Sequence, residues 1–332
     1  MAKSVSLPFC TPVLATVQGS AAIGLGINGH PTAYNGVLNQ LASLTCIRRF
    51  LRGYTTPQTA IPGANIYNFS FFERHGVTSR FGVSFFEEEI KQMLDEGYYV
   101  YFTGVDDFYI PGKSWYGIRH MAHDGILCGY DDDDRTFSIA SYDINWVFNL
   151  FRTPQECFIE GINACYSNKQ YGAITAYKLK PNTTVNLDLN MILRNVKQYM
   201  DVTIDKVPLD QDGPVSGIAV HDLLAMYIDK LKDGSIPSDK MDWRAIRPVW
   251  EHKRCMLDRI KAVEGKKEWD SELSDRYAPL VDEANRVRGM YAMYHKNQKA
   301  VLLDRIKNGL LGLREKEFDI LQAFIKRLEA ET

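Results

Sequence analysis

Two side chains at one end of a predicted β-hairpin could act together as a base. The apolar runs HDGILCGYD (123–131) and RTFSIASYD (135–143) are rich in β-forming residues and are joined by an acidic turn, a pattern typical of a hairpin. If the turn is centred between Asp132 and Asp133, Tyr142 faces His123 and Asp143 lies one step away. We therefore expect the Asp143 carboxylate to hold the His123 imidazole in one tautomer, as a general base requires.

The nucleophile that such a base would activate is expected to be Cys10. This residue directly precedes a Thr-Pro pair, which is a helix start signal, and residues 11–28 read as a helix of small and apolar residues. Unpaired N–H groups and the helix dipole at such a position stabilise a thiolate and an oxyanion. Together Cys10, His123 and Asp143 predict acyl transfer through a thioester.

The other cysteines fit a structural role better. A cysteine in an apolar context is more often a small core residue than a nucleophile, and this reading applies to Cys128, Cys157, Cys165 and Cys255. Cys46, in LASLTCIRRF, is the second candidate for the nucleophile. The six cysteines form no CxxC pair and lack the density of a small secreted domain, so a reducing cytoplasm is expected.

Two further patterns suggest ligand sites, and each has a plainer reading. His120 and His123 form H-x-x-H, which with Asp124 could begin a zinc or iron site, but the remaining histidines lack ligand spacing. The run G-x-G-x-x-G at residues 24–29 matches a dinucleotide fingerprint, yet it follows a predicted helical stretch instead of a strand. We expect neither a metal nor a cofactor.

Aromatic residues gather in the segment before His123. They are Phe108, Tyr109, Trp115 and Tyr116. Such a group could wall a pocket for an aromatic or aliphatic acyl group, or it could belong to the core.

The overall composition argues against two classes of function. With 39 Lys+Arg, 41 Asp+Glu and a formal charge of −2, the chain offers no broad cationic face for nucleic acid. It contains no run of about 20 apolar residues, so no membrane span is expected. The first 29 residues lack the compact apolar centre of a signal peptide and read as mature protein.

The predicted secondary structure changes near residue 180, from a mixture of strands and helices to helices alone. FFEEEIKQMLDEG (85–97) predicts a helix, while YYVYFTGVD (98–106) and YGAITAYKL (171–179) predict strands. Beyond Lys180, helical spacing of apolar residues predicts three to five amphipathic helices. They include AVHDLLAMYIDKLKDG, RPVWEHKRCMLDRIKAV, residues 277–296 and EKEFDILQAFIKRL. The expected class is α+β, with a catalytic domain at 1–180 and a helical domain at 181–332.

Several of these segments resemble the N-terminal domain family of the butirosin-biosynthesis acyltransferase. The similar segments are YYVYFTGVDDFYIPG, RHMAHDGILCGYDDDDRTFSIASYD and the cysteine-bearing start LPFCTPVLA. The helical portion, including RPVWEHKRCMLDRI, is similar to longer members found beside bacterial peptide-assembly genes. The resemblance covers nearly all of the chain.

This resemblance implies a papain-like, C39-peptidase-like cysteine protease fold. It also implies an enzyme that moves an acyl chain from a carrier-protein thioester to an amine, in the biosynthesis of a peptide-like antibiotic. Carried over, the nucleophile is Cys10, the base His123 and its orienting carboxylate Asp143. Papain-like enzymes place an oxyanion-hole Gln shortly before the cysteine, but residues 4–9 contain none, so backbone N–H groups or Gln18 are the expected donors.

The expected partners are an acyl carrier protein bearing a thioester and a small amine. Basic residues of the helical part are candidates for contacting an acidic carrier, namely Arg244, Arg247, Lys253 and Arg254. Two other functions fit the same residues. The first is a cysteine peptidase or amidase, with water in place of the amine, and the second is a catalytically silent binding protein in which Cys10 is buried.

Overall fold

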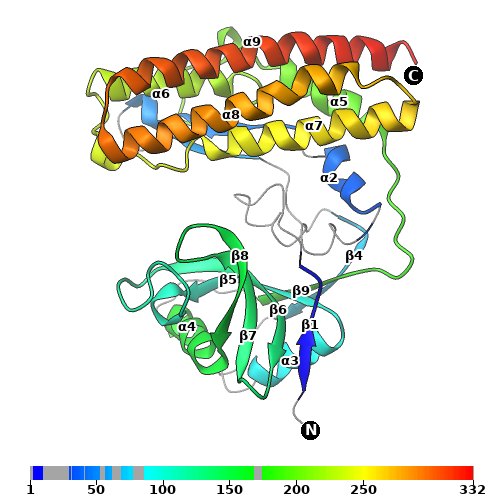
Figure 1. Cartoon of the computed structure of the whole chain (residues 1–332), viewed down its shortest axis with the longest axis vertical. Coiled ribbons are helices and arrows are strands. Elements are labelled where there is room, and N and C mark those ends of the chain that lie inside the picture. Colours follow the sequence, from blue (N-terminus) through cyan, green and yellow to red (C-terminus); the bar gives the residue numbers. More distant parts are fainter. Residues whose placement is uncertain are drawn as a thin grey trace. The chain divides into compact units, whose positions relative to one another are not determined.

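The chain divides into two compact units, the sheet unit (Met1–Tyr34 and Asn65–Val185) and the helical unit (Asn35–Ala64 and Asn186–Thr332). The computed structural model describes residues 3–9, 30, 32–40, 42–52, 57–61, 69–77, 86–167 and 174–331 (Figure 1). The expected division placed a single boundary at residue 180. The break lies instead after Val185, and residues 35–64 cluster with the helical unit, not with the sheet.

An antiparallel sheet forms the sheet unit, with the strand order β4-β9-β5-β6-β7-β8 and β1 beside β6. Its described strands are β1 (Ser4–Ser6), β4 (Phe72–Val77), β5 (Tyr99–Asp106), β6 (Ala122–Asp131), β7 (Thr136–Tyr142), β8 (Phe148–Pro154) and β9 (Ile174–Leu179). The expected strands at 98–106 and 171–179 are confirmed as β5 and β9, and the expected hairpin is confirmed as β6–β7. The sequence pattern did not single out β1, β4 and β8.

Two helices pack on this sheet and close its core. Helix α3 (Phe86–Asp95) confirms the helix expected at 85–97, with three glutamates in its first turn, where the helix dipole favours acidic residues. Helix α4 (Gln155–Ser167) follows β8 directly. Ile90 and Leu94 of α3 and Phe158 of α4 pack against buried side chains of β5, β6 and β7. The helix expected at residues 11–28 lies outside the described residues.

Strand β1 follows the edge of β6 closely. It runs antiparallel to β6, with Ser4 opposite Asp131 and Ser6 opposite Gly129, so the chain travels toward the end of β6 that carries His123. A Cβ atom at Gly129 would overlap the Val5 carbonyl oxygen, which explains the need for glycine there. The hydrogen bond from Leu7 N to Cys128 O (2.7 Å) extends this attachment by one residue.

Within the described residues, the helical unit is built mainly from five helices. They are α5 (Leu189–Asp201), α6 (Val220–Lys232), α7 (Arg247–Lys267), α8 (Glu272–Asn297) and α9 (Val301–Glu329) (Figure 1). The four sequence segments expected to be helical correspond to α6, α7, α8 and α9. Buried positions along α9, such as Leu303, Ile306, Leu310 and Leu313, recur every three to four residues and face its neighbours α6 and α8.

Smaller elements of the helical unit come from residues 34–60 and from the segments between the long helices. They are α2 (Tyr34–Gln40), β2 (Thr45–Ile47), η1 (Arg48–Arg52), β3 (Gln58–Ala60), η5 (Ile204–Lys206), β10 (Pro214–Ser216) and η6 (Ser238–Lys240). The three strands form a small antiparallel sheet in the order β10-β2-β3.

Buried side chains of α7 attach residues 35–64 to the bundle. His252 Nε2 lies 3.0 Å from Ala42 O, and Arg259 Nε donates to Leu38 O at 2.6 Å. Both side chains are fully buried, so these bonds satisfy polar groups that cannot reach water. The two units together give an α+β architecture with an antiparallel sheet, as expected. None of the helices within the described ranges is long and apolar enough to cross a membrane.

Candidate functional site

His123 is held by Asp107. Its Nδ1 atom makes a short hydrogen bond to Asp107 Oδ2, and the Asp107 side chain is only 3% exposed, whereas that of His123 is 27% exposed. An imidazole whose Nδ1 is held by a carboxylate has a fixed tautomer, with the Nε2 lone pair available to accept a proton. His123 therefore has the partner that a general base needs, and the imidazole remains partly accessible.

The carboxylate that holds His123 is Asp107, whereas the sequence predicted Asp143. Strands β6 and β7 pair as far as Ile126 and Ala140 in the described register, which stops before His123. Strand β5 continues to pair there, with Val105 opposite His123. After β5 the chain turns into η4 (Asp107–Tyr109), capped by the Asp106 carboxylate, and this turn brings Asp107 to the imidazole. The pairing of β5 with β6 therefore decides which carboxylate reaches His123. The sequence of the β6–β7 hairpin alone does not fix that pairing.

Asp143 has a different role at the start of the next turn. Its Oδ1 accepts hydrogen bonds from the backbone N–H groups of Asn145 (2.8 Å) and Val147 (3.0 Å). The turn contains Trp146 in a left-handed backbone conformation (φ 58°), which is rare for a bulky residue. The Trp146 ring meets the His123 ring edge to face, with 6.5 Å between centroids. Asp143 thus stabilises the turn that carries an aromatic neighbour of His123.

A second histidine–carboxylate pair lies beside the first. His120 Nδ1 is 2.7 Å from Asp106 Oδ2, and the other oxygen of Asp106 accepts from the N–H groups of Phe108 and Met121. The His120 ring stacks on Phe108 at 4.3 Å. Because the Asp106 carboxylate binds two backbone groups of the connection between η4 and β6, this pair anchors that connection.

A buried ammonium group lies on the far side of Asp107. Lys113 Nζ donates to Ser141 Oγ at 2.7 Å and lies 3.6 Å from Asp107 Oδ1, and the residue is 5% exposed. Burial lowers the pKa of Lys113, while the carboxylates of Asp107 and Asp124 act in the opposite direction. The Asp107 carboxylate therefore faces an imidazole through one oxygen and the Lys113 amino group through the other, and the nearby carboxylates favour the charged form of that amino group.

Apolar side chains occur in the segment before β6 and in the turn after β7, and Trp146 of that turn contacts the His123 ring. Trp115, in the connection before β6, contacts Trp146 edge to face at 6.3 Å, which joins the two loops. Four large apolar residues of these loops are at least half exposed, namely Tyr116, Ile118, Ile144 and Val147. An exposed apolar surface suits an apolar substrate group.

Cys10 lies outside the described residues, but the chain that leads to it is described. Tyr99 Oη donates to Pro8 O at 2.7 Å, and Phe9 stacks against Phe148 of β8 at 6.5 Å. Phe148 is the strand partner of Tyr142, which immediately precedes Asp143. The residue before Cys10 is thus held at the end of the sheet from which His123 and Trp146 project.

The five described cysteines, all free thiols, lack the features of a nucleophile. Cys46, the second candidate, is fully buried in β2 of the helical unit, and burial raises its pKa to about 12. Burial also raises the pKa of Cys128 to about 12 and that of Cys165 to about 11, and it raises the pKa of Cys157 and Cys255. Each of these thiols is stabilised in its neutral form, so Cys46 is a core residue.

No metal-binding group of three or more His, Cys, Asp or Glu side chains occurs within the described ranges. In the H-x-x-H pattern, His120 and His123 each face a different carboxylate. Asp124, the third proposed ligand, accepts a hydrogen bond from Tyr101 Oη at 3.2 Å, and burial raises its pKa. These residues form two separate acid–imidazole pairs instead of one ligand set.

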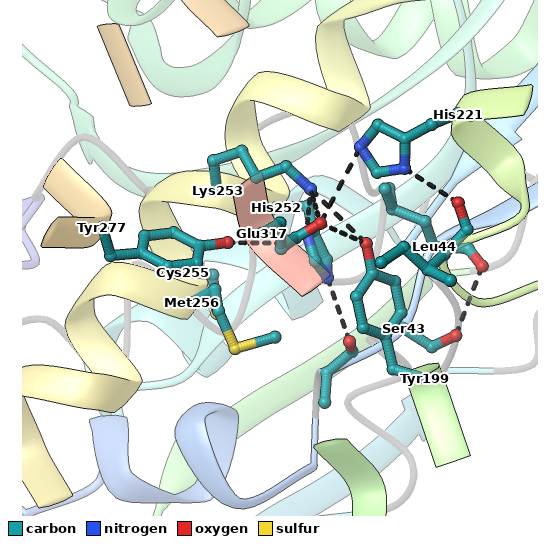
Figure 2. A network of polar contacts seen from close by, with 12 residues as sticks. Ser43, Leu44, Tyr199, His221, His252, Lys253, Cys255, Met256, Tyr277 and Glu317 are labelled. Carbon is teal, nitrogen blue, oxygen red and sulfur yellow. Dashed lines mark hydrogen bonds and ion pairs between the residues drawn. The ribbon is translucent and has the colours of Figure 1, made fainter. Parts of the chain in front are cut away.

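A buried ionic cluster connects α5, α6, α7, α8 and α9 of the helical unit (Figure 2). Its centre is Glu317 of α9, whose Oε2 accepts from Lys253 Nζ (2.6 Å) and Tyr199 Oη (2.7 Å). Tyr277 Oη donates to the other carboxylate oxygen, and His221 and His252 lie 3.9 and 3.8 Å from the carboxylate. We call these six residues the Glu317 cluster; all are at most 1% exposed.

The cluster fixes the charges of its members. Burial favours the neutral acid, but Lys253, His252 and His221 together outweigh this effect and lower the pKa of Glu317 to about 2. Burial lowers the pKa of both His221 and His252 to about 3, and the Lys253 charge adds to the effect. Both imidazoles are therefore neutral near pH 7, beside one ion pair.

The contacts of Lys253 exclude it as a residue that binds the carrier protein. Lys253 is fully buried against Glu317 and presents no charge to a partner. Arg244 is paired with Asp242, Arg247 with Glu251, and the Arg254 guanidinium stacks over Trp250 at 4.9 Å. Arg244 is exposed and Arg254 is partly exposed, so these two remain candidates, whereas the Arg247 side chain is only 14% exposed.

Replacing Glu317 by glutamine is expected to lower the free energy of unfolding by about 3–5 kcal/mol, because the Lys253 ammonium would be buried without a counter-ion. Lys253→Met should also destabilise the fold, while the double variant should lose clearly less than the sum of the two losses. Urea unfolding followed by circular dichroism measures all three. The exposed pair Lys232–Asp304 provides the control, since Asp304→Asn should cost less than about 1 kcal/mol. Additive losses would contradict a coupled ion pair.

No model of a known protein family matches the chain, and no curated protein sequence matches it either. The relation to the butirosin-biosynthesis acyltransferase domain therefore stays a prediction. The activity has to be inferred from the side chains of the chain itself.

Proposed function

We propose that the chain is a cysteine-dependent acyltransferase of papain-like fold, which joins an acyl group to an amine during the biosynthesis of a peptide-like antibiotic. The observation that carries the proposal is the His123–Asp107 pair, with a buried carboxylate on Nδ1 and a partly accessible imidazole. In this arrangement Nε2 takes a proton from a nucleophile and later returns it. Asp107 takes the orienting role first assigned to Asp143.

Cys10 is the proposed nucleophile. The described cysteines all have raised pKa values, which disfavours the thiolate that attack requires. Strand β1 leads the chain toward the His123 end of β6, and Phe9 is held there by Phe148. Both observations favour Cys10 as the thiol that His123 serves.

The proposed reaction has two halves. The Cys10 sulfur attacks the carbonyl carbon of a carrier-bound thioester after its proton moves to His123, and the carrier thiol leaves with that proton. An amine then attacks the acyl-enzyme, His123 accepts the amine proton, and the proton returns to the Cys10 sulfur as the amide is released. Trp146 at the His123 ring and the exposed apolar residues of the two loops support an acyl group with apolar character.

Mass spectrometry after incubation with an acyl-pantetheine thioester tests the nucleophile. The acyl mass should appear on the peptide that contains Cys10, and Cys10→Ala should abolish it. Cys157→Ala is the matched control, because Cys157 is only partly buried and has a raised pKa, and this variant should be acylated normally. An adduct on Cys46, or no adduct at all, would refute the assignment.

The fate of the acyl-enzyme separates this proposal from the peptidase or amidase alternative. Release that depends on added amine and yields an amide supports a transferase. Release at the same rate in water alone supports a hydrolase with the same catalytic residues.

A further inference from the structure

Lys113 reaches the candidate site because of a tight turn. Lys113 N donates to Ile110 O at 3.2 Å across Pro111 and Gly112, and Gly112 has φ 92°. Proline followed by glycine with positive φ is typical of a type II turn. Directly after it, the Lys113 side chain is buried, although the following residues 116–120 are exposed. The sequence thus places a lysine inside the protein within an otherwise exposed loop.

A hydrogen bond to Ser141 fixes the position of the Lys113 ammonium group relative to Asp107. Ser141 Oγ holds Nζ at 2.7 Å and in turn donates to Asp124 O at 2.9 Å. Nζ stays 3.6 Å from Asp107 Oδ1, longer than a direct hydrogen bond, while His123 binds the opposite oxygen. The other charged groups that act on Lys113 are Asp124 on β6 and Asp143 after β7.

We infer that Lys113 is a positioning residue whose charge moderates the pull of Asp107 on His123, so that more of the imidazole stays in the neutral form that can accept a proton. A carboxylate beside an imidazole favours the protonated ring, and a ring that is already protonated cannot act as a base. A cation on the other oxygen of the same carboxylate opposes that effect. Lys113 Nζ lies 3.6 Å from Asp107 Oδ1, so its charge acts on the carboxylate while Oδ2 stays bound to His123.

The inference rests on the proposed function, but its first test does not need activity. The protonation of His123 can be followed by NMR of the imidazole in the full chain as the pH is varied. Lys113→Met should move the titration midpoint of His123 to higher pH, because the Asp107 carboxylate then acts on the imidazole without an opposing positive charge. Lys113→Arg, which keeps the charge, should restore most of the wild-type midpoint.

Activity provides the second measurement. In Lys113→Met the acid limb of the pH profile of acyl transfer should move upward by the same amount as the imidazole titration. Another outcome is that Lys113→Met shifts the His123 midpoint while the wild-type chain transfers no acyl group. That result would support the charge effect and refute the proposed function. An unchanged midpoint in a folded Lys113→Met variant would overturn the inference.

Ser141→Ala keeps the proposal testable if Lys113→Met does not fold. Loss of the Ser141 hydroxyl frees the ammonium to approach Asp107, so the His123 midpoint should move to lower pH, opposite in direction to Lys113→Met. A shift of the His123 midpoint to higher pH in Ser141→Ala would contradict a role for the Lys113 charge.

Discussion

Asp107→Asn is expected to lower the rate of Cys10 acylation about 10⁴-fold, the effect of losing the orienting carboxylate in comparable triads. An amide at this position can donate to Nδ1 and so favours the wrong imidazole tautomer. The buried pair in question is Asp107 Oδ2 with His123 Nδ1. Single-turnover acylation by an acyl-pantetheine thioester, followed by mass spectrometry, gives the rate.

Asp143→Asn is the matched control for this prediction. Its side chain accepts from Asn145 N and Val147 N through one oxygen, which an asparagine carbonyl can replace. The rate should therefore fall less than about tenfold. A larger loss in Asp143→Asn than in Asp107→Asn would return the orienting role to Asp143. Urea unfolding of both variants is needed as well, because Asp107 is also the neighbour of the buried Lys113.

We expect acid to unfold the helical unit cooperatively, at a pH well above the pKa values of its carboxylates. His221 and His252 have pKa values of about 3 in the fold, against an ordinary value of 6.5, so the unfolded chain binds more protons between these limits. The free energy of unfolding must then fall as the pH decreases from 6.5 toward 3, by about 3 kcal/mol for each histidine at pH 4. Glu317, lowered from 4.5 to about 2, acts in the same direction below pH 4.5.

Urea unfolding followed by far-ultraviolet circular dichroism from pH 7.5 to pH 4 measures this dependence. His221→Phe should remove about half of the slope between pH 6.5 and 4.5, because it deletes one of the two neutral imidazoles. His295→Gln is the control, since His295 is exposed on α8 and should leave the slope unchanged. Equal stability at pH 7.5 and pH 4.5 would show that the two buried histidines are not neutral in the fold.

The sequence alone determined the elements whose pattern is local. The period of apolar residues predicted α3 and the long helices α6 to α9, and the acidic turn between two β-rich runs predicted the β6–β7 hairpin. It also predicted that a carboxylate lies beside His123, and the structure provides one in Asp107. These features depend on residues close together in the chain, so they can be read without the fold.

Only the tertiary structure decided which groups meet across long separations. Asp107 replaces Asp143 because β5 continues beside β6 and then turns at η4, and this register depends on the whole sheet. Lys253, which by its charge suggested a surface contact, is buried because Glu317 lies 64 residues further along the chain and offers it a counter-charge. Residues 35–64 join the helical unit because buried side chains of α7 bind their backbone carbonyl groups. Partners of this kind are set by packing, which no local pattern encodes.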